Sequence, residues 1–246
     1  MRTIWTKPPD DVYLKSNQTD VWRVTLNPMP DSIQQAVFTL SADETGRAAR
    51  FRFNEDRHRF TVSHIALRDV LARYLLCEPK QIDFTVGEYG KPVVVSKLNL
   101  DFNLSHSGDY ALIAVTRGRK VGVDVEHFRD ELEIEKIARR FFSEKENVEL
   151  MGLPAGQQCA GFFNCWTRKE AYIKAHGLGL SLPLDSFDVS LIPNQPAILR
   201  ATRPNPREAS RWTLLSLDID SQHAGAVAVE RLDLEFRFWD WNYIPR

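Results

Sequence analysis

The segment Trp166-Thr-Arg-Lys-Glu170, followed after a proline by Ser186-Phe-Asp-Val189, has a counterpart earlier in the chain. There, Ala66-Leu-Arg-Asp-Val70 is followed, again after a proline, by Ile82-Asp-Phe-Thr-Val86. Each match is weak alone, but matches that recur in the same order indicate two similar halves. We therefore expect an α+β fold of two pseudo-duplicated α/β halves, in which each half has a small, mostly antiparallel sheet packed with helices.

The spacing of apolar residues elsewhere agrees with such a fold. Helical spacing begins after the capping-box pattern Ser41-Ala-Asp-Glu44, continues to about residue 77, and returns over 134–150 and from about 162 to 175. Alternating apolar and polar residues between turn formers predict strands at 21–26, 82–86, 93–95, 102–104, 111–116, 121–126, 187–191, 212–218 and 224–229. We place the boundary between an N-terminal half, 1–118, and a C-terminal half, 119–246.

The composition is that of an ordinary globular protein of 246 residues, with 43% hydrophobic and 26% charged residues. The 32 Lys and Arg nearly balance the 33 Asp and Glu, so we expect no nucleic-acid partner. No stretch approaches the ~20 apolar residues that span a bilayer, and the start of the chain lacks the apolar run of a signal peptide. Three cysteines without a C-x-x-C pair indicate reduced thiols. We expect a cytoplasmic protein with no membrane partner.

Two acidic residues share one predicted strand, Val121-Gly-Val-Asp-Val-Glu126. Asp124 and Glu126 are two residues apart, so their side chains project from the same face of the strand. Neighbouring carboxylates repel, and a hard divalent cation such as Mg²⁺ relieves the repulsion while leaving coordination positions for water and phosphate. Alone, the pair would also fit a solvated strand end that faces Arg or Lys.

A third acidic residue lies on a predicted helix. Glu170 and Lys174 are four residues apart and share one helix face, the usual spacing of a surface ion pair. The helix is followed by Ala175-His-Gly-Leu-Gly-Leu-Ser-Leu-Pro183, a glycine-containing loop whose backbone amides suit a phosphate. The helix and the loop together favour a phosphate site, which the ion pair alone does not.

Three further segments carry potential phosphate donors. Phe102-Asn-Leu-Ser-His-Ser-Gly108 ends a predicted strand in hydroxyls and an imidazole, although a plain Ser-Gly turn would read the same way. Gly90-Lys91-Pro92 holds a lysine at a stiff turn, and basic residues gather around Arg47 and Arg50. Each segment is compatible with solvated side chains.

Taken together and in order, these pieces resemble a known family. The order is G-K-P, F-N-x-S-H-S-G, G-x-D-x-E, W-x-x-K-E-x-x-x-K and G-x-G-L-S-L-P-L, running from about residue 41 to residue 189. It is similar to that of the 4'-phosphopantetheinyl transferases, in particular the larger, surfactin-synthetase-activating class, in which one chain contains two pseudo-duplicated halves. The first forty and last fifty or so residues add no motif to the resemblance.

The resemblance implies a role for each matching residue. Asp124, Glu126 and Glu170 would hold Mg²⁺ against the pyrophosphate of coenzyme A, and Lys174 would contact the same phosphates. Ser105 and His106 would contact the nucleotide and its phosphates. The 3'-phosphate region would be bound by Lys91 and Arg47. Glu44 departs from the family pattern, because a base can stand at that position. Val70 occupies the place of Glu170 in the first half, so a single site at the junction of the halves is expected.

The resemblance further implies transfer of the phosphopantetheine arm from coenzyme A to a serine of an acyl or peptidyl carrier protein by a monomeric enzyme. Glu170 or a metal-bound water would be the base, with Lys174 as the second catalytic group. Arg139 and Arg140 would steer an acidic carrier. Two alternatives are a metal-dependent phosphohydrolase, which would need no carrier, and a non-catalytic module that binds coenzyme A or a carrier protein.

Overall fold

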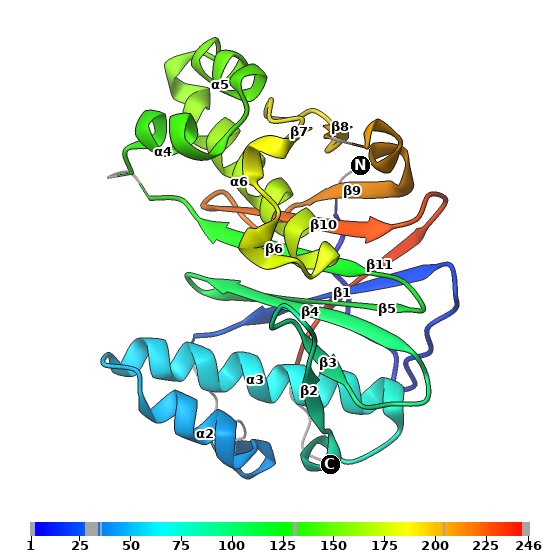
Figure 1. Ribbon diagram of the computed structural model, residues 1–246. Coiled ribbons are helices and arrows are strands. Elements are labelled where there is room, and N and C mark those ends of the chain that lie inside the picture. The colour runs from blue at the N-terminus through cyan, green and yellow to red at the C-terminus, as the bar shows by residue number, and fades with distance from the viewer. Residues whose placement is uncertain (1–2, 28–33, 35, 130–131, 204, 243–246) are drawn as a thin grey trace.

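A computed structural model describes residues 3–27, 34, 36–129, 132–203 and 205–242. In this part of the chain, two sheets lie face to face between two long helices (Figure 1). The first sheet has the strand order β11-β1-β5-β4, formed by Glu235–Asp240, Gln18–Thr25, Tyr110–Arg117 and Leu100–Ser107. The second has the order β6-β10-β9, formed by Val121–His127, His223–Glu230 and Trp212–Leu217. The α+β class and the mostly antiparallel sheets are confirmed, since only β1 and β11 pair in parallel among these strands.

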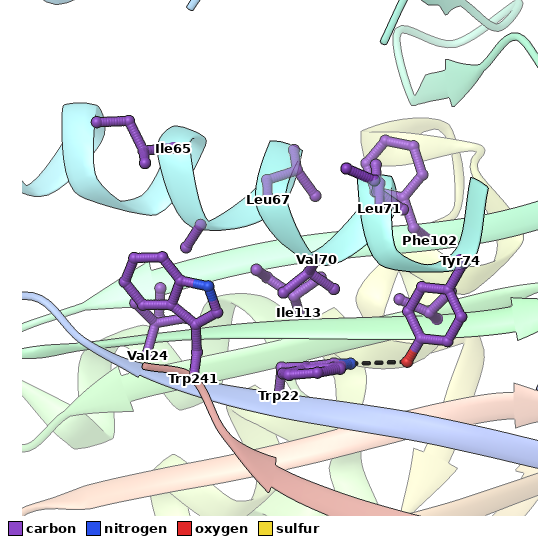
Figure 2. Packing of buried hydrophobic residues seen from close by; sticks show 14 of the residues in the cluster. Trp22, Val24, Ile65, Leu67, Val70, Leu71, Tyr74, Phe102, Ile113 and Trp241 are labelled. Carbon is purple, nitrogen blue, oxygen red and sulfur yellow. Dashed lines mark hydrogen bonds between the residues drawn. The ribbon is translucent and has the colours of Figure 1, made fainter. Parts of the chain in front are cut away.

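Each sheet is covered on its outer face by one 22-residue helix, α3 (Asn54–Leu75) on the first and α6 (Ala155–His176) on the second. Val70, Leu71 and neighbouring α3 residues pack on strands of the first sheet (Figure 2). There the indole of Trp22 donates a hydrogen bond of 2.8 Å to the hydroxyl of Tyr74. The two long helices have matching positions, one on each sheet, and they contain the first segments of the repeat in the sequence.

The shorter elements surround these layers. They are helices α2 (Ala42–Ala49), α4 (Ile134–Phe141) and α5 (Glu144–Met151), the hairpin of β2 (Phe84–Val86) and β3 (Pro92–Val94), and the pair β7 (Phe187–Val189) and β8 (Leu199–Thr202). The Ser41 capping box is confirmed at the start of α2. None of the helices in the described ranges is long and apolar enough to cross a membrane.

Some predicted boundaries were wrong. The helix expected over 134–150 is two helices, because Phe142 is extended and Ser143 begins α5 with its own capping box. Similarly, α2 and α3 are separate helices. The helix expected from about residue 162 begins at Ala155, directly after Pro154. Gly156, Gln157 and Gln158 are therefore helical. Strands β8 and β11 were not predicted.

Strand β11 connects the two halves of the chain. It follows β10 of the second sheet, but it pairs with β1 of the first. The Arg237 side chain of β11 forms an ion pair of 2.7 Å with Asp20, a carboxylate that is 0% exposed. A chain boundary at 118/119 therefore leaves the first sheet dependent on a strand from the second half.

Candidate active site

Of the two facing sheets, the edge strands β4 and β6 run beside each other, and side chains connect them. Asp101 Oδ2 accepts from the Val121 amide (3.2 Å), Asn103 Oδ1 from the Val123 amide (2.8 Å) and Ser107 Oγ from the His127 amide (3.1 Å). These residues alternate along β4, so their side chains leave the same side of the strand. We call this contact the β4–β6 seam.

The buried carboxylate of Asp124 lies on the seam. One of its oxygens, Oδ1, accepts hydrogen bonds from Ser105 Oγ (2.8 Å) and from the Lys174 ammonium (2.6 Å). Lys174 also donates to Ser105 Oγ at 2.9 Å. The other oxygen, Oδ2, is buried and has no hydrogen-bond partner among the described residues. An unsatisfied buried carboxylate oxygen is costly unless a donor or a cation reaches it.

Glu126 and Glu170 face the same carboxylate. Burial, and then the negative charge of Asp124, raises the pKa of Glu126, although Ser107 donates a 2.9 Å hydrogen bond to it. Burial and the charge of Asp124 also raise the pKa of Glu170, which the nearby Lys174 partly offsets. The charge of Asp124 thus disfavours the charged forms of both glutamates. Within the described ranges, however, no three His, Cys, Asp or Glu side chains are gathered closely enough to form a ready metal-binding group.

Helix α6 approaches β6 closely because residue 122 is glycine. A Cβ on Gly122 would lie 2.1 Å from the carbonyl oxygen of Ala171 and 2.3 Å from the Ala175 amide nitrogen. The glycine of G-x-D-x-E therefore allows the turn of α6 that carries Lys174 to lie directly over the strand that carries Asp124.

A buried ion pair fixes the position of α6 from its other side. The Lys169 ammonium, 0% exposed, lies 2.8 Å from Glu146 and donates to the carbonyls of Leu184 and Phe187 at 2.7 Å each. Glu146 in turn accepts from the Val189 amide. Since Lys169 is held in the core, its chain neighbour Glu170 is directed toward the seam.

The basic side of the site lies toward α3. Ser105 and His106 are adjacent on β4, so their side chains leave opposite sides of the strand. Partial desolvation, followed by the positive charges of His64, Lys174 and Arg59, lowers the pKa of His106. His64 stacks on Phe60 at 4.0 Å, and the Arg47 guanidinium lies 5.2 Å from the same Phe60 ring. His64 and Arg59 were not predicted, because a histidine and an arginine on a long helix give no distinctive sequence signal.

Lys91 lies elsewhere on the seam. Its ammonium binds Asp101 and the Val121 carbonyl, each at 2.9 Å. Asp101 is four residues from Ser105, about 13 Å along an extended strand. The structure therefore brings together Ser105, Asp124, Glu126, Glu170 and Lys174, places Arg47 and His106 beside α3, and leaves Lys91 at the far end of the seam.

Comparison with known proteins places the chain in a family. A model described as the 4'-phosphopantetheinyl transferase superfamily matches residues 120–229, and one for the N-terminal region of a 4'-phosphopantetheinyl transferase matches residues 24–118. The chain is 38% identical over 240 residues, 96% of its length and 98% of the relative's, to "4'-phosphopantetheinyl transferase HetI" of Nostoc sp.. The chain belongs to the 4'-phosphopantetheinyl transferase superfamily.

Other members of the superfamily are similar over shorter spans. "4'-phosphopantetheinyl transferase Sfp" of Bacillus subtilis is 36% identical over 152 residues, which cover 62% of this chain and 66% of that protein. The crystal structure of Thermotoga maritima holo-[acyl-carrier-protein] synthase aligns with a TM-score of 0.34 and 22% identity, covering 46% of this chain and 62% of that one.

Proposed function

We propose that this chain is a Mg²⁺-dependent 4'-phosphopantetheinyl transferase that moves the arm of coenzyme A onto a serine of a carrier protein. The observation that carries the proposal is the buried Oδ2 of Asp124, which has no partner among the described residues and lies beside two carboxylates of raised pKa and one lysine. Such a group suits a cation next to a phosphate. Membership of the superfamily supports the choice of coenzyme A as the phosphate compound.

The oxygen donors suit a hard cation in kind, and the three carboxylates would have to draw together around it. Asp124, Glu126 and Glu170 offer only carboxylate oxygens, which Mg²⁺ prefers. A cation among them would satisfy Asp124 Oδ2 and relieve the repulsion that raises the pKa of both glutamates. When bound, Mg²⁺ would supply positive charge to the diphosphate oxygens.

The side chains suggest how the transfer proceeds. The serine hydroxyl of the carrier forms a bond to the β-phosphorus of coenzyme A, and the bond to the bridging oxygen breaks to release adenosine 3',5'-bisphosphate. Lys174 places its ammonium beside the phosphate oxygens on which charge develops. Glu170, directly or through a metal-bound water, would accept the serine proton, a role favoured by its raised pKa. His106, His64, Arg59 and Arg47 form the basic side that would receive the nucleotide phosphates.

The serine of the carrier protein would enter through a small cavity next to Glu126. The cavity has a volume of about 120 Å³ and is lined by Glu126, Arg129, Leu132, Ile137, Phe162, Phe163 and Trp166. Helix α4, with Arg139 and Arg140 in its last turn, borders this region. We propose that an acidic carrier domain docks here, and that the enzyme acts as a cytoplasmic monomer.

Mass spectrometry of an apo carrier protein tests the function. The carrier is incubated with this chain and coenzyme A, with Mg²⁺ or with EDTA, and both the carrier mass and the nucleotide products are recorded. The expected result is a gain of one phosphopantetheine that requires Mg²⁺ and the carrier serine. Release of nucleotide without carrier modification would identify a phosphohydrolase, and binding without either product would identify a non-catalytic module.

A further inference from the structure

A pair of arginines lies away from the active site, where the chain crosses between the two sheets. Arg119 is in the turn from β5 of the first sheet to β6 of the second, and Arg231 directly follows β10, on the way to β11. Arg119 is five residues before Asp124, about 16 Å along an extended chain. The two crossings thus place two guanidinium groups together at the end of β6 opposite Glu126.

Neither arginine has a counter-ion in the described part of the chain. The Nη1 atom of Arg119 is buried without a hydrogen-bond partner. Burial, and then the charge of Arg231, lowers the pKa of Arg119, and both arginines line the same cavity. By contrast, Arg211 beside them is paired with both Glu208 and Glu230. Two like charges that line one cavity, one of them with an unsatisfied buried donor, would be stabilised by an anion between them.

The backbone around the pair is fixed. Thr116 donates a 2.7 Å hydrogen bond to the Arg119 carbonyl, and Thr213 donates one of 2.6 Å to the Arg231 carbonyl. The Glu230 amide donates to the Lys120 carbonyl at 3.0 Å, which ties the two crossings to each other. Repulsion between the guanidinium groups therefore cannot be relieved by moving the crossings apart.

The arginines open onto a shallow cavity of about 440 Å³, lined by Gly118, Arg119, Arg211, Glu230, Arg231 and Leu232. With Glu230 engaged by Arg211, the net charge that faces the cavity is positive. Planar guanidinium groups bind tetrahedral oxyanions through paired N–H donors. We propose that this cavity is a second anion site, separate from the active site, which binds a phosphate group between Arg119 and Arg231.

Thermal unfolding at matched ionic strength tests the site. Sodium phosphate is compared with sodium chloride for the wild type and for the double variant Arg119→Gln/Arg231→Gln. The wild type should gain a larger saturable rise in Tm with phosphate, relative to chloride, than the double variant, which should keep only the contribution of the active site. Without phosphate, the double variant should melt at the same temperature as the wild type or higher, because the repulsion is gone. Phosphate bound at the active site contributes equally to both proteins.

Two further variants make the comparison specific. Arg231→Gln alone removes an exposed side chain, cannot disrupt the core, and should raise the half-saturating phosphate concentration at least ~10-fold, as expected for a lost charge-assisted hydrogen bond. Arg52→Gln/Arg207→Gln changes two exposed arginines elsewhere and should keep the wild-type response. Equal phosphate effects in the wild type and the double variant would overturn the proposal, as would a wild-type effect no larger than that of chloride.

A parallel titration with glycerol 3-phosphate identifies the source of the group. A response like that to inorganic phosphate, again lost with the arginines, would assign the site to phosphate esters. A response to inorganic phosphate alone would assign it to the free oxyanion.

Discussion

One oxygen of Asp124 is held by a lysine and a serine, and the other is buried with no hydrogen-bond partner in the part of the chain that the structure describes. The first contact fixes the orientation of the carboxylate. The other oxygen, Oδ2, is available to any cation that enters the site. Orientation and availability together are what a preorganised electrostatic site requires.

Replacing either acidic residue should therefore abolish most of the activity. For Asp124→Ala and Glu170→Ala we expect turnover in carrier loading to fall at least ~10²-fold, the scale for losing one preorganised contact. Glu133→Ala, which removes an exposed carboxylate that pairs with Lys136, should have no such effect. Near-normal loading by either site variant would contradict the assignment.

Glu44 has a structural role that its sequence position did not reveal. The carboxylate is 5% exposed, caps the Ser41 amide and binds Arg68 at 2.7 Å and His64 at 3.1 Å. Burial acts to raise the pKa of Glu44, but the hydrogen bonds from His64 and Ser41 and the charge of Arg68 outweigh it and lower the pKa from 4.5 to about 2. The family pattern can have a basic residue at this position. This chain has an acid instead, and that acid holds α2 against α3.

The lowered pKa of Glu44 predicts a pH dependence of stability. Because its folded-state pKa lies below the unfolded value, the carboxylate stabilises the fold above pH 4.5, and this contribution disappears as the pH falls from 4.5 through about 2. The difference in unfolding free energy between the wild type and Glu44→Gln, measured in urea, should shrink over that interval. The loss of about 1 kcal/mol expected for the cap variant Ser41→Ala should change much less. A constant difference for Glu44→Gln would be the contrary result.

That the strand of Asp124 meets the helix of Lys174 was implied by the family resemblance. Residue types and spacing were enough only to place Asp124 with Glu126 and Glu170 with Lys174, because strand and helix periods fix which side chains share a face. They were not enough for Lys91 or His64. The position of Lys91 depends on how β3 packs on β4, and that of His64 on how α3 lies across the sheet. Such contacts arise from tertiary packing and leave no local pattern in the sequence.

At the level of elements, the contact between α6 and β6 is the most sensitive to small changes. Gly122→Ala should destabilise the protein by about 1–3 kcal/mol or more, since the added methyl group meets backbone atoms that cannot rotate away. It should also lower activity further than the loss of stability explains, because Lys174 moves away from Asp124. Calorimetry and carrier loading measure the two effects.

Gly46→Ala is the matched control for this substitution. Gly46 lies within α2, and nothing is found within 4 Å of an added Cβ. Alanine there should stabilise the protein by about 0.5–1 kcal/mol through helix propensity. If the two substitutions changed the stability equally, α6 would be able to move away from β6 without a loss of free energy.

The buried pair of Lys169 and Glu146 joins α6 to α5 and β7. Lys169→Met should cost about 3–5 kcal/mol, because it leaves the Glu146 carboxylate buried without a cation. Lys136→Met, at an exposed pair with Glu133, should cost no more than ~1 kcal/mol. Urea unfolding of both variants measures the difference, and similar values would mean that Glu146 finds another partner.

For the whole molecule, the repeat in the sequence predicted two similar layers, but not the exchange of a strand between them. Residues 235–240 alternate weakly, and no motif marks them. Their pairing with β1 depends on the buried Asp20, which needs Arg237, and on Asp69, which accepts from the Trp241 indole at 2.9 Å. Pairing between residues about 215 positions apart cannot be inferred from local patterns.

This exchange predicts how the chain behaves when it is divided. Residues 1–118 alone should remain unfolded or aggregate, because the edge of β1 is open and Asp20 lacks its cation. Co-expression with 119–246 should restore a folded complex, whereas co-expression with 119–232, which lacks β11, should not. Cooperative unfolding of 1–118 on its own, recorded by circular dichroism, would refute this dependence.

The β4–β6 seam has a consequence for how this architecture can change. A ladder of backbone hydrogen bonds forms with almost any sequence, whereas the seam depends on a few particular side chains. One of its strands also supplies Ser105, which contacts both Asp124 and Lys174. Natural selection can therefore adjust the alignment of the two sheets, and with it the spacing of acids and bases across the junction, by single substitutions that leave both hydrophobic cores intact.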